Sequence, residues 1–172
     1  MLIMGIDPGT VNLGYGLIDT ANNGVTIRDF GTIRLRRSDF SSMYEHIDCM
    51  GKNVRLFTES LKPDEVVMED FVEQGINSGK NYKEMAYIIE HLRLILRSLG
   101  YEAYIYSNGF WKKQTLKASK ASKTQIKHYV SNNIPGASEA LKNESTHVWD
   151  SVCIAYCRYM ILRREKLVSS CN

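Results

Sequence analysis

Acidic residues end two apolar runs of the chain, and a histidine and an aspartate lie three residues apart further on. Asp7 closes the run LIMGID, Glu69 follows the run EVVM, and His147 and Asp150 belong to the segment HVWD. Carboxylate oxygens are the ligands that Mg²⁺ prefers, and two such ions can hold the attacking and leaving oxygens of a phosphoryl displacement. If the fold brings these side chains together, they form a catalytic site with two Mg²⁺ ions.

Each of these positions also has another interpretation. Asp7 precedes Pro-Gly-Thr, and the pattern Asp-x-Gly-Thr at a first hairpin also occurs in actin-like kinases and ATPases. Either Glu69 or Asp70 can be the second acid, because a strand that is buried on both faces has no solvent-facing side to set the parity. His147 is either a metal ligand or a proton carrier near neutral pH.

The elements that must position these residues follow from apolar runs, turn residues and helical periodicity. Strands are predicted over 2–7, 14–19, 25–33, 65–69 and 101–107, and helices over 41–61, 81–99 and 146–166. Three consecutive strands followed by a strand, helix and strand indicate an α/β fold with a five-stranded mixed sheet. The first strand is apolar on both sides, so it should be central, with helices on both faces. We expect one domain over 1–172.

Composition limits the class of protein. With 172 residues, 44% hydrophobic and 24% charged, the chain resembles an ordinary globular domain rather than a disordered or fibrous one. No apolar run is long enough to span a membrane, and no signal peptide is evident at the N-terminus. The four cysteines show no CxxC pair, so reduced thiols are expected. These features predict a soluble, cytoplasmic protein.

Positive charge is concentrated in one segment, although the net charge is only +3. No acidic residue occurs between Glu102 and Glu139, and this segment holds six lysines. The lysines of this basic strip are Lys112, Lys113, Lys117, Lys120, Lys123 and Lys127. Lysine makes point-charge contacts to phosphates rather than bidentate base contacts, so the strip favours binding of a nucleic-acid backbone by shape. A solvated loop is the alternative.

The stretches GIDPGTVNLGYGLID, VVMED, WKKQTLKASKASKTQIKHYV and HVWDSVCIAYC resemble those of RuvC-type Holliday junction resolvases, in the same order and at similar spacing. The resemblance implies a ribonuclease H-like fold and a symmetric homodimer. It also implies an endonuclease of DNA recombination and repair that makes paired symmetric nicks in four-way DNA junctions with Mg²⁺ or Mn²⁺. The protein would be encoded by a bacterial or a viral genome.

Residue by residue, the resemblance places Asp7 as the first acid, Glu69 as the second, and His147 and Asp150 as the pair on the last helix. Aspartate is the commoner residue of the family at the position of His147. Phe71 is the candidate for an aromatic side chain that stacks on bases at the junction centre, with a core phenylalanine as the alternative. Two lysines of the basic strip, Lys113 and Lys123, match family lysines near the scissile phosphate, and Lys80 and Lys83 belong to a loop suited to lying along the backbone.

Several alternatives remain open at this stage. The helix over 81–99 has more apolar positions than one stripe requires, which fits either a core helix or a dimer seam. The chain could also be a ribonuclease acting on RNA or RNA:DNA hybrid, or a catalytically weak protein that binds branched DNA. An actin-like kinase needs two large domains around a nucleotide, and 172 residues suffice for one, so no nucleotide cofactor is expected.

Overall fold

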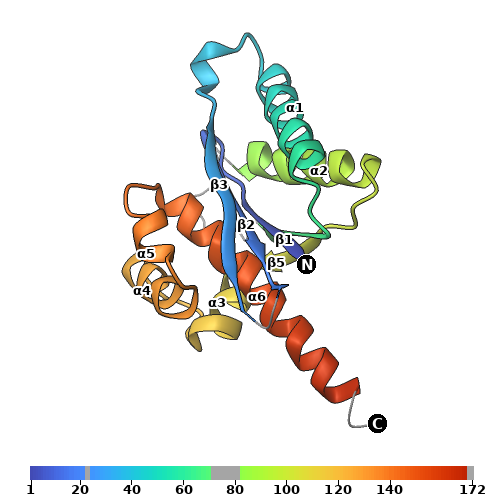
Figure 1. The fold of residues 1–172 in the computed structure, drawn as a ribbon. Helices are drawn as coiled ribbons and strands as arrows, with labels where there is room; N and C mark the ends of the chain where they lie inside the picture. The colour runs from blue at the N-terminus through green and yellow to red at the C-terminus, as the bar shows by residue number, and fades with distance from the viewer. Residues whose placement is uncertain (22–23, 71–81, 170–172) are drawn as a thin grey trace.

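The computed structural model describes residues 1–21, 24–70 and 82–169, and its centre is one five-stranded mixed sheet (Figure 1). The strands are β1 (Leu2–Asp7), β2 (Asn12–Asp19), β3 (Thr26–Arg34), β4 (Glu65–Asp70) and β5 (Tyr104–Ser107). Their order in the sheet is β3-β2-β1-β4-β5. The first three strands pair antiparallel, and β4 and β5 continue the sheet in parallel. The predicted mixed sheet with a central first strand is confirmed.

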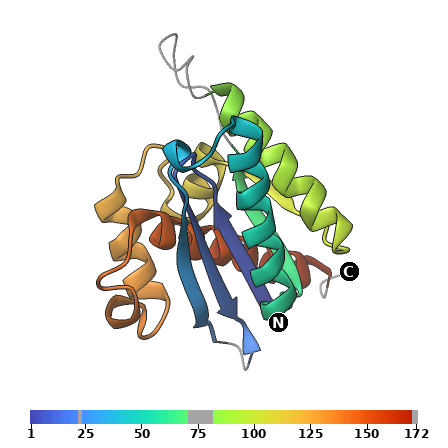
Figure 2. The same cartoon turned by 90° about the horizontal axis from the view of Figure 1, so that it is seen from above.

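Helices cover both faces of this sheet. They are η2 (Arg37–Asp39), α1 (Met43–Leu61), α2 (Tyr82–Ser98), α3 (Asn108–Leu116), α4 (Lys123–Asn133), α5 (Ala137–Ala140) and α6 (Thr146–Ser169). In Figures 1 and 2, α1 and α2 lie on one face, and α3 to α6 lie on the other. Among the helices of the described residues, none is both long and apolar enough to cross a membrane.

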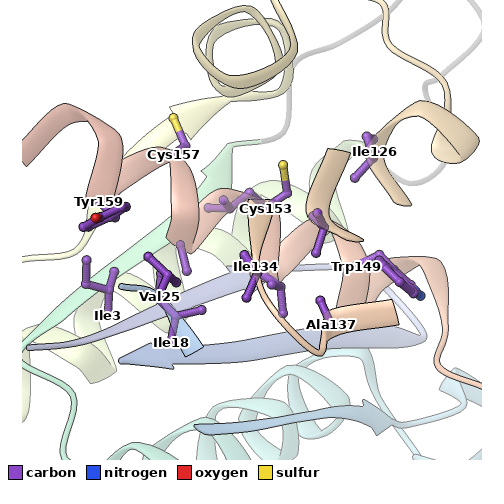
Figure 3. Close-up of a cluster of buried hydrophobic side chains, with 14 of the residues drawn as sticks. Ile3, Ile18, Val25, Ile126, Ile134, Ala137, Trp149, Cys153, Cys157 and Tyr159 are labelled. Atoms are coloured by element: carbon purple, nitrogen blue, oxygen red, sulfur yellow. The ribbon is translucent and has the colours of Figure 1, made fainter. Parts of the chain in front are cut away.

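Alternate residues of the central strand point to opposite layers. Ile3 belongs to the buried cluster beneath α6. Figure 3 shows Ile3 with Ile18 and Cys153, two other members of this cluster. Met4 and Ile6 belong to a second buried cluster beneath α1 and α2. Because side chains alternate along a strand, the odd-numbered positions of β1 face α6. Asp7 is therefore the last residue of β1 on the α6 face.

Glycines let α6 lie directly against the sheet. Gly5 of β1 pairs with Gly16 of β2, and Asp7 pairs with Gly14. A Cβ atom at Gly5 would overlap the backbone carbonyl of Ser151, and one at Gly16 would lie 2.5 Å from a methyl carbon of Val152. Such distances are far inside van der Waals contact. The absence of side chains at these positions brings the first turns of α6 against the ends of the first two strands.

The strand that follows α2 is shorter than the sequence predicts. Strand β5 begins at Tyr104 rather than at Tyr101. Gly100 has a φ of 89° and ends α2, and the backbone N–H of Tyr101 then donates to the carbonyl of Leu96 at 3.0 Å, so Tyr101 caps the helix instead of pairing with β4. Within one chain, α2 is buried on one face only, since Tyr87 and Leu94 are exposed.

The basic strip folds into two helices, α3 and α4, that periodicity did not predict. Their buried positions are few, and both helices begin with a serine cap: Ser107 accepts from Phe110, and Ser122 accepts from Gln125. The Gln125 side chain in turn accepts from the backbone N–H of Ser122, which completes a capping box. Four of the six lysines therefore lie in helices, whereas Lys117 and Lys120 lie in the connection between α3 and α4.

Candidate active site

Two neighbouring strands end with carboxylates at the same edge of the sheet. β1 and β4 run in parallel, and Val67 belongs to the cluster beneath α6 whereas Met68 belongs to the opposite cluster. Glu69 therefore lies on the α6 face, as Asp7 does, and Asp70 lies on the other. The sequence left Glu69 and Asp70 open, and the structure places Glu69 rather than Asp70 on the same face as Asp7.

Helix α6 brings the third and fourth predicted residues to this edge. His147 and Asp150 lie in its first turns, and a Cβ at Gly14 would overlap the backbone of His147. The side chains of Asp7, Glu69 and Asp150 each offer an oxygen within 4.8 Å of the others. The sequence-predicted residues from three elements thus meet at one place. We call these three acids the carboxylate cluster.

Hydrogen bonds fix the members of the cluster. The Nδ1 atom of His147 lies 2.7 Å from Oδ2 of Asp7, and the amide of Asn108 donates to Oε1 of Glu69 at 2.5 Å. The ammonium of Lys123 contacts Oδ2 of Asp150. The other carboxylate oxygen of Asp150 is buried and has no hydrogen-bond partner among the described residues. An oxygen of this kind is an available ligand for a cation.

Burial and the closeness of like charges raise the pKa values of two acids in this site. Burial and the charge of Asp7 raise the pKa of Glu69 to about 8. Burial and the charge of Asp7 also raise the pKa of Asp150, although Lys123 opposes the shift. The hydrogen bond to Asp7 raises the pKa of His147 against the effect of its burial. The raised pKa values of Glu69 and Asp150 favour a bound cation, because a cation makes the deprotonation of its carboxylate ligands favourable.

His147 occupies a different place from the other three predicted residues. It lies outside the set of carboxylates that can share one ion, because its Nδ1 atom is engaged by Asp7. Its side chain remains 33% exposed and borders a pocket of about 360 Å³ that also includes residues 8–12 and Met85. The imidazole ring is therefore accessible from that pocket.

The lysines of the basic strip are distributed unevenly around the cluster. Lys123 reaches Asp150, and the ammonium of Lys127 lies 5.5 Å from the ring centre of Trp149. Lys112 is buried, whereas four lysines are exposed, namely Lys113, Lys117, Lys120 and Lys123. Lys83 is exposed in the first turn of α2. Phe71 and Lys80 lie outside the described residues.

The sequence interpretation missed Asn108 and the packing glycines. Asn108 follows β5, the strand beside β4, and therefore lies at the same edge of the sheet as Glu69. Its position after a predicted parallel strand was a usable signal, since the carboxyl ends of parallel strands share one edge. The close approach of Gly14 and Gly16 to α6 had no comparable signal, because glycine in a strand also marks bulges and bends.

The fold and the carboxylate cluster define a ribonuclease H-like protein. Among solved structures, the chain is similar to RuvC of Thermus thermophilus, with a TM-score of 0.79 at 16% identity over 96% of this chain and 97% of the other. It is also similar to the same organism's RuvC in complex with a Holliday junction substrate, with a TM-score of 0.76 at 16% identity and with 95% and 96% covered. At this identity the similarity shows a common fold.

Sequence comparison identifies the family. The family model described as crossover junction endodeoxyribonuclease RuvC matches residues 3–158, and the chain belongs to this family. It is 29% identical to the RuvC protein of Dehalococcoides mccartyi over 160 residues, which are 92% of this chain and 91% of the relative. It is 27% identical to RuvC of a Nitratiruptor species, with 96% of this chain and all of the relative covered.

Proposed function

We propose that this protein is a divalent-metal-dependent endonuclease that resolves four-way DNA junctions by paired symmetric nicks. The observation that carries the proposal is the buried cluster of Asp7, Glu69 and Asp150, built by three separate elements of a chain that belongs to the RuvC family. A related protein of the same fold has been solved with a Holliday junction substrate. These facts together favour junction cleavage over hydrolysis of RNA.

The donor set of the cluster fits Mg²⁺ or Mn²⁺. All its ligand atoms are carboxylate oxygens, and the Oδ1 atom of Asp150, which has no hydrogen-bond partner among the described residues, is free to bind a cation. We propose two ions, held by Asp7, Glu69 and Asp150, with His147 adjusting the charge of Asp7. When bound, such ions supply an activated water and stabilise charge on the leaving 3′ oxygen.

The remaining side chains of the site bind, orient or move protons. His147 has Nδ1 fixed by Asp7, so its Nε2 atom is available to exchange a proton with the reacting water or the leaving group. Asn108 holds the Glu69 carboxylate in place through its amide. Lys123 is half-exposed while its partner Asp150 is buried, so its ammonium is placed to move between Asp150 and a DNA phosphate.

DNA is proposed to lie across the α3–α4 side of the cluster. The exposed lysines of the basic strip give that side phosphate-binding groups at several points. Lys83 belongs to α2 on the other face of the sheet and remains a separate candidate for backbone contact. We retain Phe71 and Lys80 as candidates for base stacking and backbone contact, respectively.

Paired nicks require two active sites related by symmetry, and we propose that α2 forms the two-fold interface. Tyr87 and Leu94 lie seven residues apart on the outward side of α2, with 50% and 56% of their surface exposed. The ring of Tyr44 on α1 lies 6.5 Å from that of Tyr87 and extends the apolar surface.

The protein should sediment as a dimer, and Leu94→Glu should shift it toward monomer. Leu56→Glu, at an equally exposed leucine on α1, should not, and a monomeric wild-type protein would refute the interface.

One assay tests the whole proposal. The purified protein is offered a four-way DNA junction, a linear duplex and an RNA:DNA hybrid, each with Mg²⁺, Mn²⁺ or EDTA. We expect paired nicks in the junction with either metal and none with EDTA. Preferential cleavage of the hybrid would indicate a ribonuclease instead. Junction binding without cleavage in either metal would indicate a binding protein without catalysis.

A further inference from the structure

Two adjacent lysines of α3 have opposite environments. Trp111, Lys112 and Thr115 form the buried side of α3, and Lys112 is only 8% exposed. Its neighbour Lys113 is exposed, although the sequence resemblance made Lys113 the better match to a lysine near the reacting phosphate. The structure therefore places a different lysine inside the molecule, next to the carboxylate cluster.

The buried ammonium of Lys112 lacks an anion within bonding distance. The ammonium of Lys112 forms no hydrogen bond or ion pair with the described residues, and its Nζ atom lies 5.3 Å from the centre of the Trp111 ring. Its charge is felt by Asp150, but the ammonium that contacts Asp150 is that of Lys123. Burying an ammonium without a hydrogen-bonded anion is unfavourable, so its retention here calls for a ligand.

Lys112 borders a pocket of about 610 Å³ whose charged lining residues are both lysines. The lining residues, which we call the lysine pocket, are Asn108, Lys112, Ser119, Lys120 and Ala121. Two ammonium groups, an amide and a hydroxyl face this space, and no acidic residue lines it. Such a lining fits an anion with several acceptor oxygens.

The lysine pocket adjoins the site of the proposed reaction. Asn108, one of its lining residues, is the residue that donates to Glu69 at 2.5 Å. A DNA strand whose reacting phosphate lies on the carboxylate cluster would therefore bring a flanking phosphate to the pocket.

We propose that the lysine pocket binds a phosphate of the DNA backbone next to the scissile one, with Lys112 as its buried cation and Lys120 at its rim. This inference rests on the proposed function. It assigns to Lys112 the part that the sequence resemblance gives to Lys113. A free lysine held inside the protein would fix the register of the strand over the cluster, because its position is set by the packing of α3.

The test removes one charge from the protein and one from the DNA, separately and together. The nick positions are mapped first, and junctions are then made in which one non-scissile linkage near the nick is a neutral methylphosphonate. Binding in EDTA is measured for the wild-type protein and for Lys112→Met. We expect the wild type to lose about tenfold in affinity at one linkage, which is the effect of one charge-assisted hydrogen bond. Lys112→Met should lose about tenfold on the unmodified junction and nothing further at that linkage.

Lys113→Met is the matched control, since it removes the same charge one residue away on the exposed side of α3. It should retain the wild-type response to that linkage. If Lys112→Met does not fold, Lys120→Ala, at an exposed residue of the same pocket, must show the same coupling. Equal responses of the wild type, Lys112→Met and Lys120→Ala at every linkage would overturn the pocket and leave the proposed function standing. A wild-type protein that does not bind junctions would overturn both.

Discussion

The two ends of β4 carry the same residue type in two different environments. Glu65 and Glu69 are four residues apart on one strand, so both side chains face α6. At the first end, α6 supplies Arg158, whose guanidinium donates to both Glu65 oxygens at 2.6 and 3.2 Å. At the second end, α6 supplies Asp150, which adds a like charge beside Glu69.

The two ends of β4 differ in whether their charged side chains are paired within the protein. The Arg158 guanidinium also stacks over the ring of Tyr104 at 3.7 Å, so the Glu65 end has its charges and donors satisfied. The Glu69 end keeps an excess of negative charge and an unpartnered oxygen on Asp150. A protein that used both ends for packing would pair both. We therefore propose that the second end is the functional one, since Lys123 balances only part of its negative charge.

The largest effect is expected for Glu69→Gln. Removing one metal-binding carboxylate should lower junction cleavage about 10³-fold, which corresponds to about 4 kcal/mol of transition-state stabilisation. Junction binding in EDTA should change little, and the Tm of the metal-free protein should stay equal or rise, because a repulsive charge is lost. Glu65→Gln is the control: the same substitution on the same strand should keep the cleavage rate of the folded protein but lower its Tm. Similar cleavage by both variants would contradict the distinction between the two ends.

Arg158→Met should have the largest effect on folding. It leaves Glu65 without its guanidinium partner while preserving the apolar stem, and removing one member of a buried ion pair costs about 3 kcal/mol. The free energy of unfolding from urea titration measures this loss. Adding Glu65→Gln should recover part of it, because the two residues are in contact. A loss under about 0.5 kcal/mol, typical of surface substitutions, would show that this pair contributes nothing.

The sheet and the ends of its strands were predictable because their signals are local. The strands ending at Asp7 and Glu69 are apolar runs closed by an acid, and α1 ends before Pro63 as its periodicity indicates. Helix α4 was not predicted, since few of its residues are buried and its apolar periodicity is weak. The capping box of Ser122 and Gln125 was a local signal for its start that remained unused.

The site was only partly predictable, because its partners come from distant elements. Asp7, Glu69 and Asp150 meet as expected, but the sequence could not choose Glu69 over Asp70, since parity requires knowing which face α6 covers. The burial of Lys112 rather than Lys113 depends on the rotation of α3 about its axis. That rotation is set by the packing of Trp111 in the core, which no spacing reveals.

The pH dependence of stability sharpens the comparison. The folded-state pKa of Glu69 is raised to about 8 by burial and by Asp7, so the folded protein holds a proton that the unfolded chain loses near its ordinary value. Stability of the metal-free protein must therefore fall as pH rises from about 5 to about 8. The raised pKa values of Asp150 and His147 act in the same direction, because each group favours its protonated form when folded.

In EDTA we expect the Tm of the wild type to fall by about 5 °C across this window, and that of Glu69→Gln to fall less. Added Mg²⁺ should raise the wild-type Tm most at the upper end of the window, where the ligand carboxylates lose their protons most easily. Parallel curves of Tm against pH for the wild type and Glu69→Gln in EDTA would show that the folded-state pKa of Glu69 is not raised.

The smallest expected effect tests whether a cap far from the sheet supports the functional end. Ser122 caps α4, whose first residue is Lys123, the partner of Asp150. Ser122→Ala should cost about 1 kcal/mol of unfolding free energy. It should also lower cleavage a few-fold, because the first turn of α4, which carries Lys123, becomes less ordered. Ser42→Ala removes the equivalent cap of α1, where Ser42 accepts from the backbone of Glu45. It should cost the same stability without changing cleavage by the folded protein, and equal losses of cleavage in both variants would mean that Lys123 needs no fixed helix start to reach Asp150.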